Sequence, residues 1–261
     1  MNLTLHEIAW HRSMGQMIES LDKDNFWAAL ARLLGEYVAC DSWVALVFTV
    51  GRPVVFAESP TEDGNPDPLF QDYLNGLYLL DPFYVASRES AVNGLFRLSD
   101  VAPECFDQTD YYQRYFRLNV VADELQFNVQ LDSQRTLCLS LGSKRRFTLE
   151  QVTLLELLRP WVAALMRQRM TFERELLDAA TEPAPHWQSR IESRVGQINT
   201  PLTGRELEVG QLVLSGYSSK EIAGKLEISV ETVKVHRKHM YSKLGIKSQS
   251  ELFSLFLQAQ M

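Results

Sequence analysis

The chain has 261 residues, of which 46% are hydrophobic and 23% are charged, so a largely disordered protein is excluded. Its length suits one large domain or two smaller ones, each with a proper core. With 26 Lys and Arg against 33 Asp and Glu the formal net charge is −7, but this charge is unevenly divided. It is +2 from Asn199 onward and −9 before, which predicts a polyanion-binding module joined to an acidic domain.

The cysteines and the apolar segments indicate where the protein resides. Cys40, Cys105 and Cys138 lie far apart and form no CxxC pair, so we expect free core thiols in a reducing compartment. The N-terminus lacks the pattern of a signal peptide, and no run of eighteen apolar residues occurs. We therefore expect a cytoplasmic protein, and no motif calls for a cofactor.

The first half of the chain alternates between predicted helices and strands. Apolar residues recur at helical spacing over residues 25–38. The runs "SWVALVFTV" and "PVVFAE" predict two strands joined by a turn at Gly51 and Arg52. Residues 61–68 have the composition of a loop. Further along we expect a helix over 69–76, a short helix in "DPFYVASRES", a strand in "GLFRLSD" and an aromatic helix over 107–118.

Two more strands are predicted in "VADELQFNVQLDSQRTLCLSLGS", with their turn near Asp132 and Ser133. A long amphipathic helix follows from Thr148, which forms a capping box with Gln151, and Pro160 is a point where this helix can kink. Helices flanking an antiparallel sheet of about five strands indicate an α+β fold. This is the α/β/α sandwich of PAS-type and GAF-type sensor domains.

A change in composition separates the two halves. The stretch "DAATEPAPHWQSR" holds two prolines and small polar residues without apolar periodicity. We therefore divide the chain into a sensor or interaction domain over residues 1–178, a linker over 179–199 and a C-terminal domain over 200–261.

The C-terminal domain predicts four short helices joined by tight turns. A Ser or Thr that can cap a helix stands at the start of each one. Gly216 and Gly245 stand where the first and third helices should end, because glycine tolerates the left-handed backbone of a helix C-cap. The expected helices cover 203–215, 218–226, 229–244 and 248–258, with a helix-turn-helix over about 218–237.

The run "LTGRELEVGQLVLSGYSSKEIAGKLEISVETVKVHRKHMYSKLGIKSQSEL" resembles the LuxR/GerE-type DNA-binding domain. That family shows LTxRE, KEIA, L-x-I-S, TVKxH and KLG in this order. The resemblance implies an all-α four-helix domain whose third helix enters the DNA major groove, with dimers reading two half-sites. Lys234, Val235 and Lys238 are the implied base-edge contacts. The residues implied to contact phosphate or to pack are Thr232, His236, Arg237, Lys220 and Lys243.

Three details of this domain depart from the family or suggest other chemistry. The family often has Arg where this chain has Gln249, and Gly210 replaces a large apolar residue in the first helix. His236 and His239 have a spacing that permits metal binding, but the cations between them repel a metal ion and no third ligand is near. We expect no metal site.

The first domain lacks the motifs of two common control domains. There is no acidic pair of a phosphorylated receiver and no GxxxxGK[ST] of an ATPase. There is also no HExxH, GxSxG or carboxylate–His constellation, so we expect no enzyme and no catalytic residues. A small-ligand sensor and a protein-interaction module remain as alternatives.

The segment "LFQDYLNGLYLLDPFYVASRES" resembles the Tyr…Asp-Pro region of autoinducer-binding domains in quorum-sensing LuxR proteins. This resemblance implies that Tyr73 and Asp81 hold a ligand. The chain has Leu69 where the family has Trp, and the spacing from Tyr to Asp is one residue short, so we expect an amphipathic ligand other than an acyl-homoserine lactone. Alternatively, Asp81 caps a helix and Tyr73 packs in the core. Further candidates for the pocket are Trp43, Phe83, Tyr84, Tyr111 and Tyr112.

The sequence thus predicts a LuxR-type transcription regulator, controlled by a small effector and binding operator DNA as a homodimer. The long helix from Thr148 is the expected place for contact with a second subunit. RNA polymerase is a further partner if the protein activates transcription. The alternative is a LuxR-type regulator controlled by a protein partner or by its expression level.

Overall fold

The computed structural model describes residues 5–60, 67–89, 92–120, 122–174, 177 and 201–258. The predicted boundaries of the linker lie outside the described residues. Contacts group the chain into two units. One comprises Met1–Gly64, Ser90–Arg97 and Val120–Glu182, and the other comprises Asn65–Glu89, Leu98–Asn119 and Pro183–Met261. Each is described by itself.

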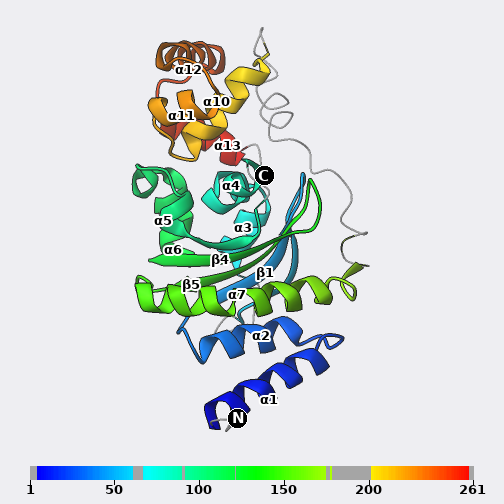
Figure 1. Ribbon diagram of the computed structural model, residues 1–261. Coiled ribbons are helices and arrows are strands. Elements are labelled where there is room, and N and C mark those ends of the chain that lie inside the picture. Colours follow the sequence, from blue (N-terminus) through cyan, green and yellow to red (C-terminus); the bar gives the residue numbers. More distant parts are fainter. Residues whose placement is uncertain are drawn as a thin grey trace. The chain divides into compact units, whose positions relative to one another are not determined.

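The first unit is built on a five-stranded antiparallel sheet with the strand order β2-β1-β5-β4-β3 (Figure 1). The expected strands and the antiparallel α+β arrangement are confirmed. The strands are β1 (Ser42–Phe48), β2 (Val54–Glu58), β3 (Gly94–Arg97), β4 (Asp123–Gln130) and β5 (Thr136–Ser143).

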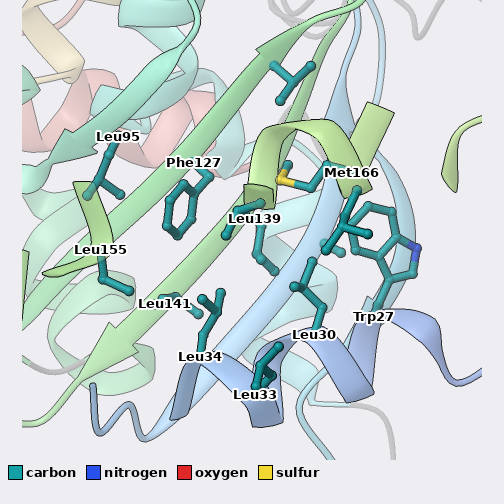
Figure 2. Packing of buried hydrophobic residues seen from close by; sticks show 14 of the residues in the cluster. Trp27, Leu30, Leu33, Leu34, Leu95, Phe127, Leu139, Leu141, Leu155 and Met166 are labelled. Carbon is teal, nitrogen blue, oxygen red and sulfur yellow. The ribbon is translucent and has the colours of Figure 1, made fainter. Parts of the chain in front are cut away.

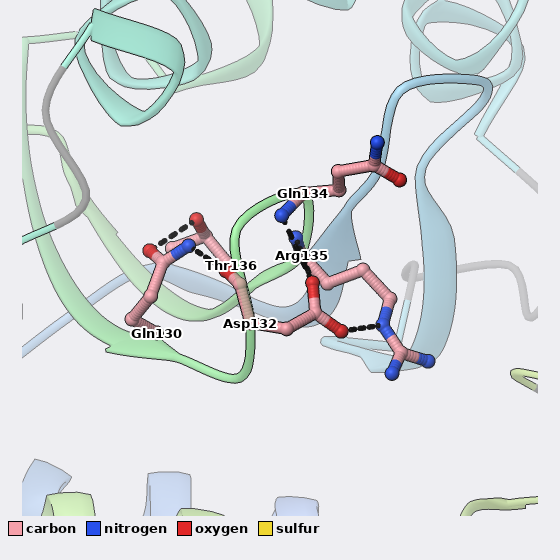
Figure 3. A network of polar contacts seen from close by, with 5 residues as sticks. All are labelled: Gln130, Asp132, Gln134, Arg135 and Thr136. Atoms are coloured by element: carbon pink, nitrogen blue, oxygen red, sulfur yellow. Dashed lines mark hydrogen bonds and ion pairs between the residues drawn. The ribbon is translucent and has the colours of Figure 1, made fainter.

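The turn between β4 and β5 is held by a carboxylate, as Figure 3 shows. Asp132 Oδ1 accepts hydrogen bonds from the N–H groups of Gln134 and Arg135, each at 2.9 Å. The same side chain forms an ion pair with the Arg135 guanidinium at 2.6 Å. An aspartate that satisfies the backbone two and three residues later is a common device of tight turns, and it fixes the register of this hairpin.

Among the described residues, the sheet unit contains three helices: α1 (Leu5–Glu19), α2 (Phe26–Gly35) and α7 (Leu149–Arg169). Side chains of α2 and α7 pack with one face of the sheet into a single hydrophobic core, part of which is drawn in Figure 2. Alternate residues of β4 and β5 supply that face, because successive side chains of a strand point to opposite sides. They are Leu125, Phe127, Val129, Leu137, Leu139 and Leu141.

The long helix α7 begins as expected, with Thr148 and Gln151 in a complete capping box, and it runs through Pro160 to Arg169. Its inward side chains include Val152 and Leu155. Trp161 of the same helix is 48% exposed. Helix α1 was not expected, because its apolar residues are sparse; Met14 and Met17 nevertheless belong to the core.

The second unit contains two groups of helices. The first group comes between β2 and β4 in chain order, and the second consists of the four C-terminal helices. The first group is α3 (Pro68–Leu74), η1 (Leu77–Leu80), α4 (Pro82–Glu89), α5 (Leu98–Val101), η2 (Phe106–Gln108), η3 (Tyr112–Phe116) and α6 (Arg117–Asn119). The aromatic helix expected over 107–118 is therefore divided among η2, the π-helix η3 and α6.

All three cysteines are free thiols. Cys138 is buried and Cys40 is half-buried, but Cys105 is exposed, so the expectation of a core thiol is wrong for that residue. Cys105 directly precedes η2, in a connecting segment at the surface. Within the described residues, none of the helices has the length and apolar character required to cross a membrane.

Candidate DNA-binding face and buried aromatic cluster

The C-terminal helices form where their capping residues stand. Thr203 with Glu206 and Ser218 with Glu221 form complete capping boxes, and Ser229 Oγ accepts the N–H of Thr232 at 3.0 Å. The observed bounds agree with the predicted ones to within one residue. They are α10 (Gly204–Leu214), α11 (Ser219–Lys225), α12 (Val230–Leu244) and α13 (Gln249–Gln258).

The turn between α11 and α12 positions the second of these helices. Glu227 has a φ of 53°, a left-handed conformation that is uncommon for residues other than glycine. The following Ile228 N–H donates to the Ala223 carbonyl at 3.0 Å. At the other end, Gly245 ends α12 with a φ of 67°, and Gly216, after α10, has a φ of 96°, as predicted.

Helix α12 has one buried face and one exposed face. Val233 and Met240 are completely buried and Leu244 is 9% exposed, so they attach the helix to the rest of its domain. Lys234 and Lys238, four residues apart, are exposed together with Val235, which is 48% exposed. Two ammonium groups and a branched apolar side chain thus share the solvent-facing side of the helix.

A surface ion pair accompanies Lys234. Its Nζ lies 2.8 Å from Glu231 Oε1, and both side chains are more than half exposed. An exposed pair one helical turn apart contributes little stability, because water solvates both charges nearly as well. Lys234 can therefore leave Glu231 for a stronger anion at small cost.

Two of the residues that were predicted to contact phosphate or to pack already bind other residues of the protein. Lys243 Nζ donates to Glu206 Oε2 at 2.7 Å and to the Pro201 carbonyl at 3.2 Å. Arg237 Nε donates to the Tyr241 hydroxyl at 3.3 Å, and its guanidinium lies 5.3 Å from the centre of that ring. These geometries favour the packing role for both residues.

The remaining candidates differ in exposure. Lys220, at the start of α11, is exposed, while Thr232 and His236 are half-buried on α12. Gln249 donates through Nε2 to the Val213 carbonyl at 2.8 Å, so it joins α13 to α10. Gly210 is buried in α10. Among the described residues, no group of three or more His, Cys, Asp or Glu side chains is placed to hold a metal ion.

The second candidate site is a buried aromatic cluster around Asp81, which we define as Tyr73, Tyr78, Tyr84, Tyr111 and Tyr115. The ring of Tyr73 stacks on that of Tyr115 with centroids 5.3 Å apart, and Tyr111 lies 5.4 Å from Tyr115. Tyr78 meets Tyr73 and Tyr84 edge to face. Every ring of the cluster is at most 6% exposed.

Asp81 makes two different hydrogen bonds inside this cluster. Its Oδ2 accepts from the Tyr73 hydroxyl at 2.6 Å, and its Oδ1 accepts from the N–H of Phe83 at 2.8 Å. The second bond caps the start of α4, so capping and contact with Tyr73 occur together. Burial raises the pKa of Asp81 to about 6, although the bonds from Tyr73 and the backbone oppose this shift. Burial, followed by the Asp81 charge, raises the pKa of Tyr73 well above its usual value.

The predicted ligand residues are brought together only in part. Phe83 and Tyr84 follow Asp81 on α4, and Tyr111 belongs to the cluster. Tyr112 stacks on Phe116 instead. Trp43, on β1, lies opposite Leu141 and packs against the hydrophobic core of the sheet unit. Sequence reasoning missed Tyr78 and Tyr115, because only the folded helices place them beside Tyr73.

A capped helix-turn-helix with exposed lysines on its second helix, joined to an α+β domain of sensor type, defines a DNA-binding transcription regulator. The model of the bacterial regulatory proteins of the luxR family matches residues 200–256. An HTH-type transcriptional regulator in the exeN 3′ region of Aeromonas salmonicida is 33% identical over 183 residues, which are 68% of this chain and 93% of that protein. The chain belongs to the luxR family.

Solved structures resemble the N-terminal part as well. The VqsR ligand-binding domain from Pseudomonas aeruginosa is 51% identical with a TM-score of 0.60, covering 63% of this chain and 97% of that one. SdiA in complex with octanoyl-rac-glycerol is 17% identical with a TM-score of 0.45, covering 100% of this chain and 97% of that one. The protein is a LuxR-family transcriptional regulator, and its N-terminal part is similar to the VqsR ligand-binding domain.

Proposed function

We propose that α12 reads operator DNA in the major groove through Lys234, Val235 and Lys238, with Lys220 and Thr232 at the phosphates. The observation that supports this most directly is the two-sided burial of α12. Its three base-contact candidates are exposed on one side, while Val233, Met240 and Leu244 are buried on the other. Lysine can donate to the acceptors of guanine, and valine can contact a thymine methyl group.

The test compares a double variant with a control of the same charge change. Lys234→Ala with Lys238→Ala should abolish specific binding to the operator in a gel shift, while circular dichroism stays unchanged. A control double variant, Lys23→Ala with Lys144→Ala, removes two lysines of the sheet unit and should bind normally. Unchanged operator affinity in the first variant would refute the assignment of α12.

We also propose that a small effector bound in the N-terminal domain controls this regulator. The similarity to the VqsR ligand-binding domain supports the proposal, because it is 51% in identity and covers 97% of that domain. The proposed contacts are Tyr73, Asp81, Tyr84 and Tyr111, with Phe83 beside them. Trp43 is left out because it packs against the hydrophobic core. Control by a protein partner is the alternative. It predicts that Asp81→Asn leaves regulation in cells unchanged, whereas effector control predicts an altered response.

A homodimer is the third part of the proposal. Helix α7 carries an exposed apolar stripe of Leu157, Pro160, Trp161 and Ala164, at the spacing of one helical face. Leu157 is 70% exposed, which is unusual for a residue of this size within a contiguous stripe. A second copy of the chain is the natural occupant, since two half-sites require two recognition helices.

Sedimentation velocity tests the dimer. Leu157→Glu with Trp161→Glu should give monomers, while Arg159→Glu, which makes the same change of charge on another face of the helix, should leave the dimer intact. Dimers in both variants would show that α7 is not the interface. Acting on DNA, such a dimer would work in the cytoplasm, and it would contact RNA polymerase if it activates transcription.

A further inference from the structure

The exposed face of α12 carries one acidic side chain among its cations. Glu231 is the single acid of this helix, whose sequence contains four Lys and Arg residues. Its side chain is 78% exposed, and it precedes Val235 and Lys238 by four and seven residues, so the three lie on one face of the helix. That is the face proposed to enter the major groove. The phosphates of DNA repel a carboxylate, so an acid at this position requires an explanation.

The helix dipole explains an acid in this turn but not its access to a partner. Ser229 caps α12 by accepting the N–H of Thr232, and Glu231 lies in the first turn, where a carboxylate interacts favourably with the dipole. That interaction is similar on every side of the turn. Val230 and Thr232, its neighbours in the turn, are half-buried, whereas Glu231 is exposed. The carboxylate is therefore accessible to a molecule that docks on this face.

The partner of Glu231 within the protein is one of the proposed base contacts. Lys234 Nζ donates to Glu231 Oε1 at 2.8 Å, from one helical turn further along. An ammonium group has three N–H donors and a carboxylate has two oxygens, so this contact leaves each side chain able to bind a further group. The pair thus presents hydrogen-bond donors directly beside an acceptor.

Base pairs differ in how their major-groove edges complement such a pair. Guanine offers two neighbouring acceptors, N7 and O6, and the cytosine paired with it offers its 4-amino donor next to them. An adenine–thymine pair places its donor between its two acceptors instead. A lysine beside a carboxylate therefore matches the order of groups on a guanine–cytosine pair, with the ammonium at guanine and the carboxylate at the amino group of cytosine.

We infer that Glu231 is a specificity-determining residue, which accepts a hydrogen bond from the 4-amino group of a cytosine while Lys234 donates to the guanine paired with it. The hydrogen bond offsets the repulsion between the carboxylate and the phosphates at that base pair. A sequence that lacks the amino group there leaves the repulsion in place, so Glu231 weakens binding to other sequences more than to the operator. The inference rests on the proposed reading of DNA by α12.

The test begins with a selection from random DNA duplexes by the full-length protein, which should yield a half-site that contains a guanine–cytosine pair. Each cytosine of the selected half-site is then replaced in turn by N4-methylcytosine. This base still pairs with guanine, but a methyl group takes the place of the N–H that faces the major groove. At one position the replacement should weaken binding by the unmodified protein about tenfold in a gel shift, and it should leave binding by Glu231→Ala nearly unchanged.

A matched control removes another exposed acid of the same domain. Glu208 forms an ion pair with Arg205 at 2.7 Å, also one helical turn apart, but on α10. Glu208→Ala makes the same change of charge as Glu231→Ala, and it should lose about tenfold on N4-methylcytosine, as the unmodified protein does.

A second variant separates base reading from support of the helix. Glu231→Gln removes the charge, and with it the interaction with the helix dipole, but it keeps an acceptor oxygen at the same reach. It should therefore remain sensitive to N4-methylcytosine, whereas Glu231→Ala should not. A purely structural role predicts that the two variants respond alike.

The outcomes separate this inference from the proposed function. If Glu231→Ala loses as much on N4-methylcytosine as the unmodified protein, or if no position is sensitive in either, the role of Glu231 is overturned, while reading by α12 stands on the selected sequence. Insensitivity of Glu208→Ala would assign the effect to net charge and overturn it as well. If the unmodified protein selects no sequence, the proposed function and the inference fall together.

Discussion

Lys243 Nζ lies 2.7 Å from Glu206 Oε2, so the last turn of α12 is joined to the first turn of α10. Glu206 is 3% exposed and also accepts the N–H of Thr203 at 2.7 Å. One carboxylate therefore completes the capping box of α10 and also holds α12 in place. A lysine that the family resemblance made a candidate for phosphate contact or packing serves first as a structural element.

We predict that Lys243→Met destabilises the C-terminal domain by about 2 kcal/mol, because it leaves a nearly buried carboxylate without its cation. Burial opposes the ionisation of Glu206, but hydrogen bonds from Lys243 and Thr203 outweigh it and lower its pKa. The stability from this pair is therefore present above the ordinary glutamate pKa and is lost as the pH falls below it. Urea unfolding at pH 7 and pH 4 measures both effects. A similar loss in the exposed control Lys247→Met would contradict the prediction.

Asp81 should give the N-terminal domain the opposite pH dependence. Its folded pKa of about 6 lies above the ordinary aspartate value, so its contribution is fully present below about pH 4 and is lost as the pH rises through 6. Between pH 4.5 and 7.5 the unmodified protein should lose on the order of 2 kcal/mol relative to Asp81→Asn, which keeps an acceptor but cannot ionise. If urea unfolding gave parallel curves of stability against pH for the two proteins, this contribution of Asp81 would be excluded.

The turn of the helix-turn-helix contains a backbone conformation that its side chain disfavours. Glu227 is exposed and has a φ of 53°. Glu227→Gly should stabilise the domain by about 0.5 to 1 kcal/mol, since glycine adopts left-handed backbone without steric cost. The matched change Glu231→Gly, inside α12, should destabilise it by about 1 kcal/mol. Thermal unfolding of the two variants should shift in opposite directions.

A buried ion pair stabilises the C-terminal end of α7. Arg169 Nε lies 2.7 Å from Glu173 Oε1, both side chains are at most 7% exposed, and Trp27 Nε1 donates to the same oxygen at 2.9 Å. Glu173→Ala should cost about 3 kcal/mol or more, because it leaves a buried guanidinium unpaired. Glu173→Gln should cost less, since its amide oxygen still accepts from Trp27. If Glu173→Ala and Glu173→Gln lost the same free energy of unfolding in urea, the charge of Glu173 would not contribute to stability.

Local patterns predicted the structure well, and long-range packing was harder to foresee. The caps at Thr203, Ser218 and Ser229 depend on neighbours three residues away, so the sequence alone located those helix starts. Tyr73 and Asp81 were named through a family resemblance as contacts of a ligand, but their hydrogen bond to each other, across eight residues, was not predicted. The contact between Tyr115 and Tyr73 was not predicted either, because no short motif joins two residues that are more than forty positions apart.

The burial of strand β4 shows a different limit of sequence reasoning. The alternation in "DELQFNVQ" predicted β4, but alternation is expected to place polar residues in solvent. Only the exposures of Gln126 and Asn128 show that both faces of this strand are buried.

The origin of the helix caps has a consequence for the order in which the chain folds. Each C-terminal helix closes its own first turn with residues no more than four positions apart, whereas Ser42 of β1 must find Gly142 of β5, about a hundred residues later. Contacts close in sequence form quickly, and distant strand pairings are slow. When the full-length chain is refolded from denaturant in a stopped-flow experiment, the C-terminal helices should therefore form before the five-stranded sheet has closed, so a chain caught midway already holds its DNA-binding domain.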